Sequence, residues 1–293
     1  MNDTNMLVLN STITKYSNLL TDIDVARRVG FDAMEIHTYK LDRYLEAGYS
    51  ELDLGVALSD VPVIAAGYVA DVERQGRARE DLFREAERIF GLAKTVGARG
   101  VQILSGPIDV QAVIDHAGGK RGGMYSDLLG LSTPELIHLA AKNVAVLADM
   151  ANESDLLLYL EPLSWSPING LQNALQLIDE AGRDNVKLVI DYWHCFTSGV
   201  TPGEVAKLDE SLIFGVHVCD SLPYDGGIPI ETAMRDVPTG QGVLNLKEWT
   251  EAVKSTGYSG WWCGETFSKK MQQQNPYDLA RQIKQTLVEL VLT

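Results

Sequence analysis

The segments LLLYLEP at 156–162 and VKLVID at 186–191 decide the fold class of this chain of 293 residues. Both are short apolar runs rich in Leu, Val and Ile, which is typical of strands buried on both faces. Between them, residues 170–181 carry apolar side chains at helical spacing. A strand, a helix and a second strand in this order predict a parallel βαβ unit.

The same alternation recurs along the whole chain. About eight strand–helix units follow one another, with no linker rich in Pro, Gly or Ser between them. No G-x-G-x-x-G follows the first strand, which disfavours a dinucleotide-binding sheet. The sequence therefore predicts an α/β protein, a single (β/α)8 TIM barrel over residues 1–293 with a closing C-terminal helix. Further strands are expected at 6–10, 33–37, 61–67, 100–106, 212–220 and 260–267, and further helices at 18–29, 78–96, 133–150, 202–208, 246–255 and 275–291.

The composition is acidic, with 25 Lys and Arg against 40 Asp and Glu and a net charge of −15. Binding to nucleic acid or to an anionic membrane needs a basic face, so we expect neither partner. The sequence also shows neither an apolar run of about 18 residues nor a secretory signal. Its three cysteines, Cys195, Cys219 and Cys263, form no C-x-x-C pair. We therefore expect a cytoplasmic protein with reduced thiols.

A polar side chain stands at the end of each of the last four predicted strands: Glu161, Asp191, His217 and Glu265. The C-terminal ends of barrel strands meet at one mouth, where catalytic residues lie. Three carboxylates and an imidazole with nothing basic among them would repel one another, and a divalent cation would remove that repulsion. Three oxygen donors and one nitrogen suit Mn²⁺ best, or Mg²⁺ or Co²⁺, in preference to a structural zinc.

Each of these four residues alone has a simpler interpretation. A single acidic residue at a strand end often caps the following helix or pairs with a cation. His217 alone would be interpreted as a core histidine. Their occurrence on four consecutive strands favours the metal site over these alternatives.

Three further polar residues follow the same strands. His194 is expected to hydrogen-bond a substrate oxygen or a metal-bound water, or else to cap the next helix. Asp220 is expected to orient a neighbouring ligand, or Arg235. Arg235 itself is expected to hold a substrate oxygen, with a solvent-exposed pair to Asp236 as the alternative.

Aromatic residues and long connections surround the predicted site. Trp165, Trp193 and Phe267 flank the ligands and are candidates to pack on the apolar face of a sugar ring, or else are core aromatics. The connections at 107–132 and 221–244 are long and contain several glycines. Because loops after strands lie on the catalytic face of a barrel, they are candidate lids, with plain surface insertions as the alternative.

The runs LYLEP, VIDYWH, GVHVCD, GQG and GETF, all within 155–268, resemble the xylose-isomerase-like TIM-barrel superfamily of sugar isomerases and epimerases. That superfamily includes ketose 3-epimerases, inosose dehydratases and inosose isomerases. GFDAMEIH at 30–37 is a weaker upstream match. The resemblance implies the metal ligands already inferred. It also implies that Glu161 and Glu265 transfer protons and that His194 and Arg235 contact the substrate.

Two reactions are consistent with this site. The first is a divalent-metal-dependent isomerisation or epimerisation of a ketose or keto-cyclitol, by carboxylate proton transfer next to a metal-bound carbonyl through an enediolate. The alternative is a lyase that uses the same enolate for β-elimination, such as an inosose-type dehydratase or a C-glycoside deglycosidase acting on a 3-keto sugar. A non-catalytic sugar-binding barrel is a third possibility. The expected partner is a small sugar or keto-sugar, with Trp165 against it, and we expect a homo-oligomer, with a second kind of subunit as the alternative.

Overall fold

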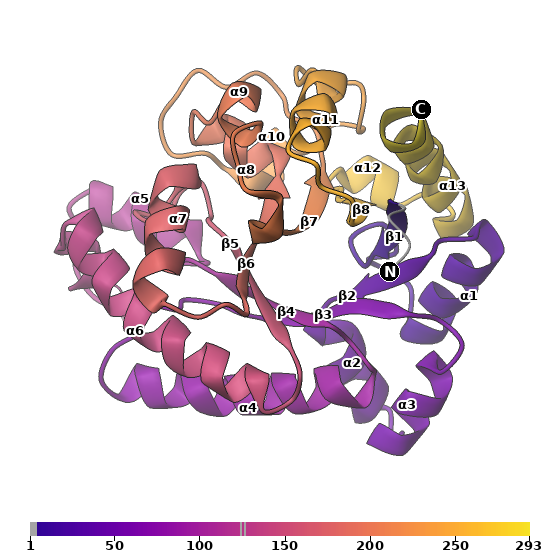
Figure 1. The fold of residues 1–293 in the computed structure, drawn as a ribbon, viewed down its shortest axis with the longest axis horizontal. Coiled ribbons are helices and arrows are strands. Elements are labelled where there is room, and N and C mark those ends of the chain that lie inside the picture. The colour runs from indigo at the N-terminus through magenta and orange to yellow at the C-terminus, as the bar shows by residue number, and fades with distance from the viewer. Residues whose placement is uncertain (1–4, 124, 126) are drawn as a thin grey trace.

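The computed structural model describes residues 5–123, 125 and 127–293, and its centre is a closed barrel of eight parallel strands (Figure 1). The strands pair in chain order, and β8 returns to pair with β1. This arrangement confirms the predicted (β/α)8 TIM barrel. The strands are β1 (Met6–Asn10), β2 (Ala33–Ile36), β3 (Val63–Val69), β4 (Gly100–Leu104), β5 (Leu157–Glu161), β6 (Val186–Asp191), β7 (Ile213–Val218) and β8 (Trp261–Gly264).

A ring of helices surrounds the barrel, and α13 lies beside α1 where the ring closes (Figure 1). The predicted closing helix is therefore confirmed, with a short π-helical turn at Val288–Leu292 after it. No helix within the described residues is long and apolar enough to cross a membrane. The helices are α1 (Leu19–Val29), α2 (Thr38–Glu46), α3 (Glu51–Leu58), α4 (Arg77–Thr95), α5 (Val110–Ala117), α6 (Thr133–Asn152), α7 (Gly170–Ala181), α8 (Tyr192–Thr197), α9 (Pro202–Val205), α10 (Glu231–Met234), α11 (Leu246–Ser255), α12 (Lys269–Gln272) and α13 (Pro276–Leu287).

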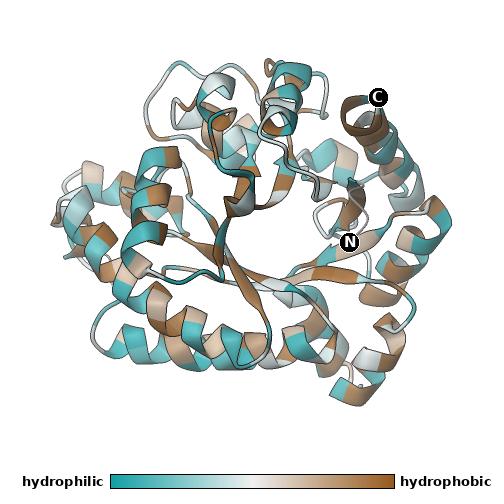
Figure 2. Ribbon diagram, viewed as in Figure 1, coloured by the Kyte–Doolittle hydropathy of each residue, from teal (hydrophilic) through white to brown (hydrophobic). Residues whose placement is uncertain are grey.

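Local capping signals fix where the predicted helices begin and end. Asn18 accepts a hydrogen bond from the Thr21 backbone N–H at the start of α1, and Gly30 ends that helix with φ of +80°. Helix α6 begins at Thr133, as predicted, with Ser132 as its N-cap in a capping box with Glu135. Figure 2 shows hydrophilic and hydrophobic residues alternating along the outer helices, as expected for helices with one buried face.

Some connections contain helices that the sequence did not predict. Two helices, α2 and α3, lie between β2 and β3. The long connection at 107–132 contains α5, and the one at 221–244 contains α10. Both connections are therefore partly helical. Residues 124 and 126 of the first connection lie outside the described residues.

Side chains fill the lower part of the barrel interior, so the barrel is a packed core and not a pore. Tyr159, Val189, Trp261 and Cys263 lie in one buried cluster there. The indole of Trp261 leaves no room for a side chain on β7, since a Cβ on Gly215 would lie 2.0 Å from Trp261 Cζ2. Glycine at 215 therefore permits the large ring that closes the barrel below the mouth.

Candidate active site

The four predicted strand-end residues come together at the mouth of the barrel, above this packed interior. Each offers one ligand atom, and these atoms all lie within 4.8 Å of one another. All four side chains are buried, with residue exposures between 1% and 7%. We call Glu161, Asp191, His217 and Glu265 the mouth cluster.

Strand geometry explains why these side chains meet. Successive side chains of a strand point to opposite faces, so residues two apart share a face. Glu161 follows the inward-facing Tyr159, and Asp191 follows Val189, which lies in the same interior cluster. Asp191 is also the register partner of His217 across β6 and β7. Glu265 lies one residue beyond β8, and its backbone N–H donates to the Val218 carbonyl, which continues the pairing.

One imidazole nitrogen is the common neighbour of the three carboxylates. Nδ1 of His217 lies 3.3 Å from Glu161 Oε1, 3.7 Å from Glu265 Oε2 and 3.9 Å from Asp191 Oδ2. Burial alone would lower the pKa of His217, but interactions with Glu35, Cys263 and Glu265 raise it well above its usual value. The same arrangement favours any positive charge at this point.

The two glutamates of the mouth cluster have opposite pKa shifts. Burial, with the charges of Asp191 and Glu265, raises the pKa of Glu161. Burial also acts to raise the pKa of Glu265, but the guanidinium of Arg235 and the nearby histidines outweigh it and lower that pKa. Two carboxyl groups at one site thus differ in their affinity for a proton, which suits a pair that exchanges protons.

Arg235 is in contact with the mouth cluster, which corrects two expectations. Its Nη2 donates to Glu265 Oε2 at 2.7 Å and to Asp191 Oδ2 at 3.2 Å, so a basic group does lie among the ligands. The side chain is 2% exposed and stacks 4.4 Å from the Phe267 ring, and so does not form the solvent-exposed pair with Asp236. Sequence spacing missed these contacts because the residues are 44 and 30 positions apart.

Glu35 on β2 is a buried carboxylate that the sequence analysis did not select. It is 4% exposed and lies against Nε2 of His217, on the side of the ring away from the mouth cluster. Burial would raise the pKa of Glu35, but the His217 charge and hydrogen bonds from His217 and Tyr159 lower it to about 2. The available signal was a charged residue inside the apolar strand Ala33–Ile36.

His194 is held in one tautomer at the cavity wall. Its Nδ1 accepts a hydrogen bond from the Ser164 backbone N–H at 3.1 Å, so the ring hydrogen is on Nε2. Burial lowers the pKa of His194 to about 3, so the imidazole is neutral. The backbone N–H of His194 donates to Asp191 Oδ1, so Asp191 caps α8 and also belongs to the mouth cluster.

A cavity of about 230 Å³ opens above the mouth cluster. Glu161 and Glu265 line it, together with a third carboxyl group, Glu231 of α10. Burial, with the charges of Glu265 and Asp191, raises the pKa of Glu231 to about 7. His37 and His194 also line the cavity, and no Lys or Arg lies among its described lining residues.

Only two of the three flanking aromatics face this cavity. Trp165 and Phe267 line it, and Trp165 is fixed by a hydrogen bond from Nε1 to the Pro107 carbonyl at 2.7 Å. Trp193 is fully buried, and its ring lies 5.4 Å from the Arg235 guanidinium. Its alternative interpretation, a core aromatic, is therefore the one that the structure supports.

Asp220 contacts a loop and not a ligand, contrary to expectation. Its carboxylate accepts backbone hydrogen bonds from Ser221, Gly240, Gly242 and Leu244, at 2.8 to 3.1 Å. The approach is so close that a Cβ on Gly242 would lie 2.2 Å from Asp220 Oδ1. Asp220 therefore fastens the end of the 221–244 connection beside the mouth.

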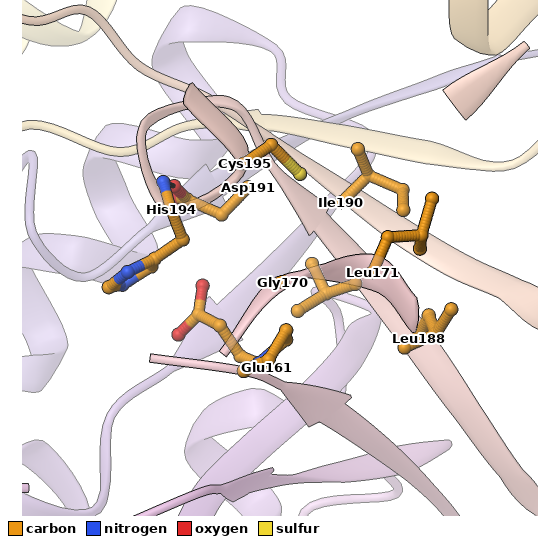
Figure 3. Close-up of a pocket in the computed structure, with 10 residues that line it drawn as sticks. Glu161, Gly170, Leu171, Leu188, Ile190, Asp191, His194 and Cys195 are labelled. Atoms are coloured by element: carbon orange, nitrogen blue, oxygen red, sulfur yellow. Dashed lines mark hydrogen bonds between the residues drawn. The ribbon is translucent and has the colours of Figure 1, made fainter. Parts of the chain in front are cut away.

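Behind the site, the wall between β5, β6 and the helices that follow them is tightly packed. Figure 3 shows the Glu161 carboxylate near Asp191 and His194, with Leu188, Ile190 and Leu171 on the other side. The crevice there has a volume of about 10 Å³, which is about one water molecule. The 230 Å³ cavity, and not this crevice, can hold a small molecule.

The mouth cluster fits a divalent cation chemically. It supplies three carboxylate oxygens and one imidazole nitrogen, and hard or borderline ions such as Mn²⁺, Mg²⁺, Co²⁺ and Zn²⁺ accept such a set. Asp191 Oδ1 and Glu161 Oε2 are occupied by the His194 N–H and by the Gln102 amide. Glu161 therefore presents Oε1 toward the shared point near His217, and Asp191 presents Oδ2, which also accepts a hydrogen bond from Arg235.

The fold and site together define a (β/α)8 barrel with a buried carboxylate–imidazole cluster at its C-terminal mouth. The chain belongs to the xylose isomerase-like TIM barrel family, whose model matches residues 23–288. This match confirms the resemblance to the xylose-isomerase-like superfamily that the sequence motifs indicated. The named relatives are enzymes, which agrees with the prediction that this chain is an enzyme.

Relatives match almost the whole chain. An inosose isomerase of Halalkalibacterium halodurans is 24% identical over 287 residues, covering 96% of this chain and 94% of the relative. A 3-dehydroshikimate dehydratase of Pseudomonas aeruginosa is 25% identical over 256 residues, covering 85% of this chain but 36% of that protein. A crystal structure of the IOLI protein with a bound zinc atom has a TM-score of 0.84 at 21% identity, covering 98% of each chain.

Proposed function

We propose that this chain is a divalent-metal-dependent isomerase or epimerase of a ketose or keto-cyclitol. The observation that carries the proposal is the buried mouth cluster, two of whose carboxylates, Glu161 and Glu265, also line the cavity. The similarity to inosose isomerases over nearly the whole chain supports a keto-cyclitol as the substrate. Mn²⁺ is our proposed ion, with Mg²⁺ or Co²⁺ as alternatives, and the zinc of the IOLI structure supports a divalent site in this fold.

The chain's own residues supply binding and proton transfer. Held by the mouth cluster, a divalent ion would supply Lewis-acid polarisation of a substrate carbonyl. Glu161 and Glu265 reach the cavity from β5 and from the end of β8, so they can serve different atoms or faces of one substrate. One removes the proton next to the carbonyl and the other returns a proton at the neighbouring atom or on the opposite face.

Other residues position the substrate in this scheme. Nε2–H of His194 can donate to a substrate oxygen because Nδ1 is already bonded. Trp165 presents an aromatic wall to a sugar ring. Arg235 does not line the cavity, so we propose that it holds Asp191 and Glu265 in place, instead of the predicted direct contact with substrate.

The cavity favours an uncharged polyol as substrate. The three carboxylates of the mouth cluster outweigh the charge of one divalent ion, and the described lining of the cavity includes no Lys or Arg to pair with a carboxylate or phosphate ligand. The hydroxyl groups of a keto-cyclitol or ketose can donate hydrogen bonds to such carboxyl groups. We therefore favour a neutral substrate over an acidic one such as that of a dehydroshikimate dehydratase.

A lyase is the second candidate, supported by the dehydratase relative. The same removal of a proton next to a carbonyl can be followed by loss of a β-substituent, either water or a carbon-linked aglycone of a 3-keto sugar. The cytoplasmic location and the homo-oligomer, with another kind of subunit as the alternative, stay predictions. The three free thiols fit a reducing compartment.

Incubation of the Mn²⁺-loaded protein with inososes, ketoses and 3-keto-glycosides in D₂O tests these reactions. An isomerase or epimerase incorporates deuterium at carbon into a product that is otherwise unchanged in mass. Loss of water or release of an aglycone would instead identify the lyase. No exchange and no product with any of these substrates would contradict both candidates.

A further inference from the structure

Glu35 is a buried carboxylate that the proposed proton transfer does not use. Both of its oxygens lie close to Nε2 of His217, Oε2 at 3.1 Å and Oε1 at 3.2 Å. The two side chains are 5% and 1% exposed. This contact joins β2 to β7 across the barrel interior, between residues 182 positions apart in the sequence.

Other donors hold the Glu35 carboxylate in one orientation. Asn10 Nδ2 donates to its Oε2 at 2.6 Å, and Tyr159 Oη donates to its Oε1 at 2.8 Å. The Cys263 thiol lies 3.4 Å from Oε2. Glu35 is thus surrounded by donors, so it accepts a hydrogen from His217 and has none to give.

The other nitrogen of the same ring faces the mouth cluster. A neutral imidazole has one N–H and one lone pair. When the hydrogen is on Nε2, toward Glu35, the lone pair is on Nδ1, which has Glu161, Asp191 and Glu265 as neighbours. Glu35 therefore selects the tautomer in which His217 can act as a ligand beside the three carboxylates.

We propose that Glu35 is a positioning residue for the metal site, which accepts the Nε2 hydrogen of His217 and so directs Nδ1 to the cation. This inference rests on the proposed metal-dependent function. Carboxylates behind a ligating histidine orient the ring and raise its basicity, and their loss typically weakens metal binding 10- to 100-fold. Glu35 on β2 would thus strengthen metal binding by orienting His217, without being a ligand itself.

Calorimetric titration of the metal-free full chain with Mn²⁺ tests the proposal. Glu35→Gln keeps the shape of the side chain but turns an NH₂ group toward one of the surrounding donors, and we expect its Kd for Mn²⁺ to rise about 10- to 100-fold. Glu73→Gln is the matched control, because Glu73 is an equally buried glutamate, 2% exposed, with no contact to the mouth cluster among the described residues. Its Kd is expected to stay within about twofold of wild type.

A measurement on the wild type covers the case in which Glu35→Gln does not fold. Long-range ¹H–¹⁵N NMR of the Zn²⁺-loaded protein shows which nitrogen of His217 carries the hydrogen. We expect the hydrogen on Nε2, and a hydrogen on Nδ1 would overturn the proposal. Wild-type affinity in Glu35→Gln would overturn this inference alone, whereas a wild type that binds neither ion would overturn the proposed function as well.

Discussion

Two groups of buried carboxylates lie at or just beyond the C-terminal ends of strands in this barrel. The mouth cluster comes from β5 to β8, and the second group, Asp71 and Glu73, follows β3. Glu73 Oε2 accepts the Gly106 backbone N–H at 3.1 Å, and Asp71 Oδ1 accepts that of Ile108 at 2.7 Å. A Cβ on Gly106 would lie within 2.6 Å of both carboxylates, so the main chain fills the space between them.

The difference shows which buried acids are available for chemistry. Asp71 and Glu73 converge on the backbone of the turn after β4 and accept hydrogen bonds from its N–H groups. The mouth cluster instead converges on an imidazole nitrogen, with a cavity above it. Burial and charge alone do not distinguish the two groups, but the partner of each oxygen does.

The largest contrast between the two groups is expected in catalysis. Glu265→Gln should lower the rate of deuterium incorporation from D₂O by at least about 10²-fold, because it removes one of the two proton-transferring carboxylates. Glu73→Gln should leave the rate within about twofold. Circular dichroism checks that both variants stay folded. Near-wild-type exchange in the Glu265 variant would disprove its assigned role.

Metal removal should affect stability through the mouth cluster only. A cation present at about 100 times its Kd stabilises the folded state by about 2.7 kcal/mol. We therefore expect a chelator to lower the Tm of the wild type and of Glu73→Gln by the same amount. The Tm of Asp191→Asn should respond much less, because a ligand is missing. An equal response in all three proteins would place the stabilising ion elsewhere.

The second group, through Glu73, should instead affect how the stability of the protein depends on pH. Burial raises the pKa of Glu73 to about 7, above the ordinary value near 4.3. The folded state therefore holds a proton that the unfolded chain releases, so stability from this group is complete below about pH 4 and is lost as the pH rises toward 7. Urea unfolding of the wild type should lose up to about 3 kcal/mol over this window relative to Glu73→Gln. A constant difference across these pH values would refute the shift.

The smallest expected effect concerns the loop beside the mouth cluster. Asp220→Ala removes the acceptor of the Gly240, Gly242 and Leu244 backbone N–H groups. We expect KM to rise a few-fold with little change in Kd for Mn²⁺, because Asp220 contacts the loop and not the ligands. Faster proteolysis within 221–244 would accompany this change. Loss of Mn²⁺ binding in this variant would return Asp220 to its originally predicted place beside a ligand.

The barrel and the mouth cluster could be predicted because both depend on local sequence. Each strand is a short apolar run, and each ligand is the polar residue at the end of one, so parallel strands bring them together without knowledge of long-range contacts. Helices α2 and α3 were missed, although Ser50 and Asp53 form a capping box that marks the start of α3. Each of these helices is only eight or nine residues long, so its apolar periodicity is weaker than the strand patterns on either side.

The supporting contacts could not be predicted, because they depend on how distant segments pack. Glu35 meets His217 across 182 positions, and Arg235 reaches two ligands from a loop whose course the sequence does not specify. Trp193 and Trp165 look alike in sequence, but one lies beneath Arg235 and the other lines the cavity. Such choices depend on side-chain packing at the mouth, which periodicity does not describe.

Anomalous diffraction from crystals soaked in Mn²⁺ tests the central claim most directly. The account predicts a single strong peak within bonding distance of Glu161, Asp191, Glu265 and Nδ1 of His217, and its loss in Asp191→Asn. A peak bound through Asp71 and Glu73, or the absence of any peak among the four mouth residues at saturating Mn²⁺, would contradict it.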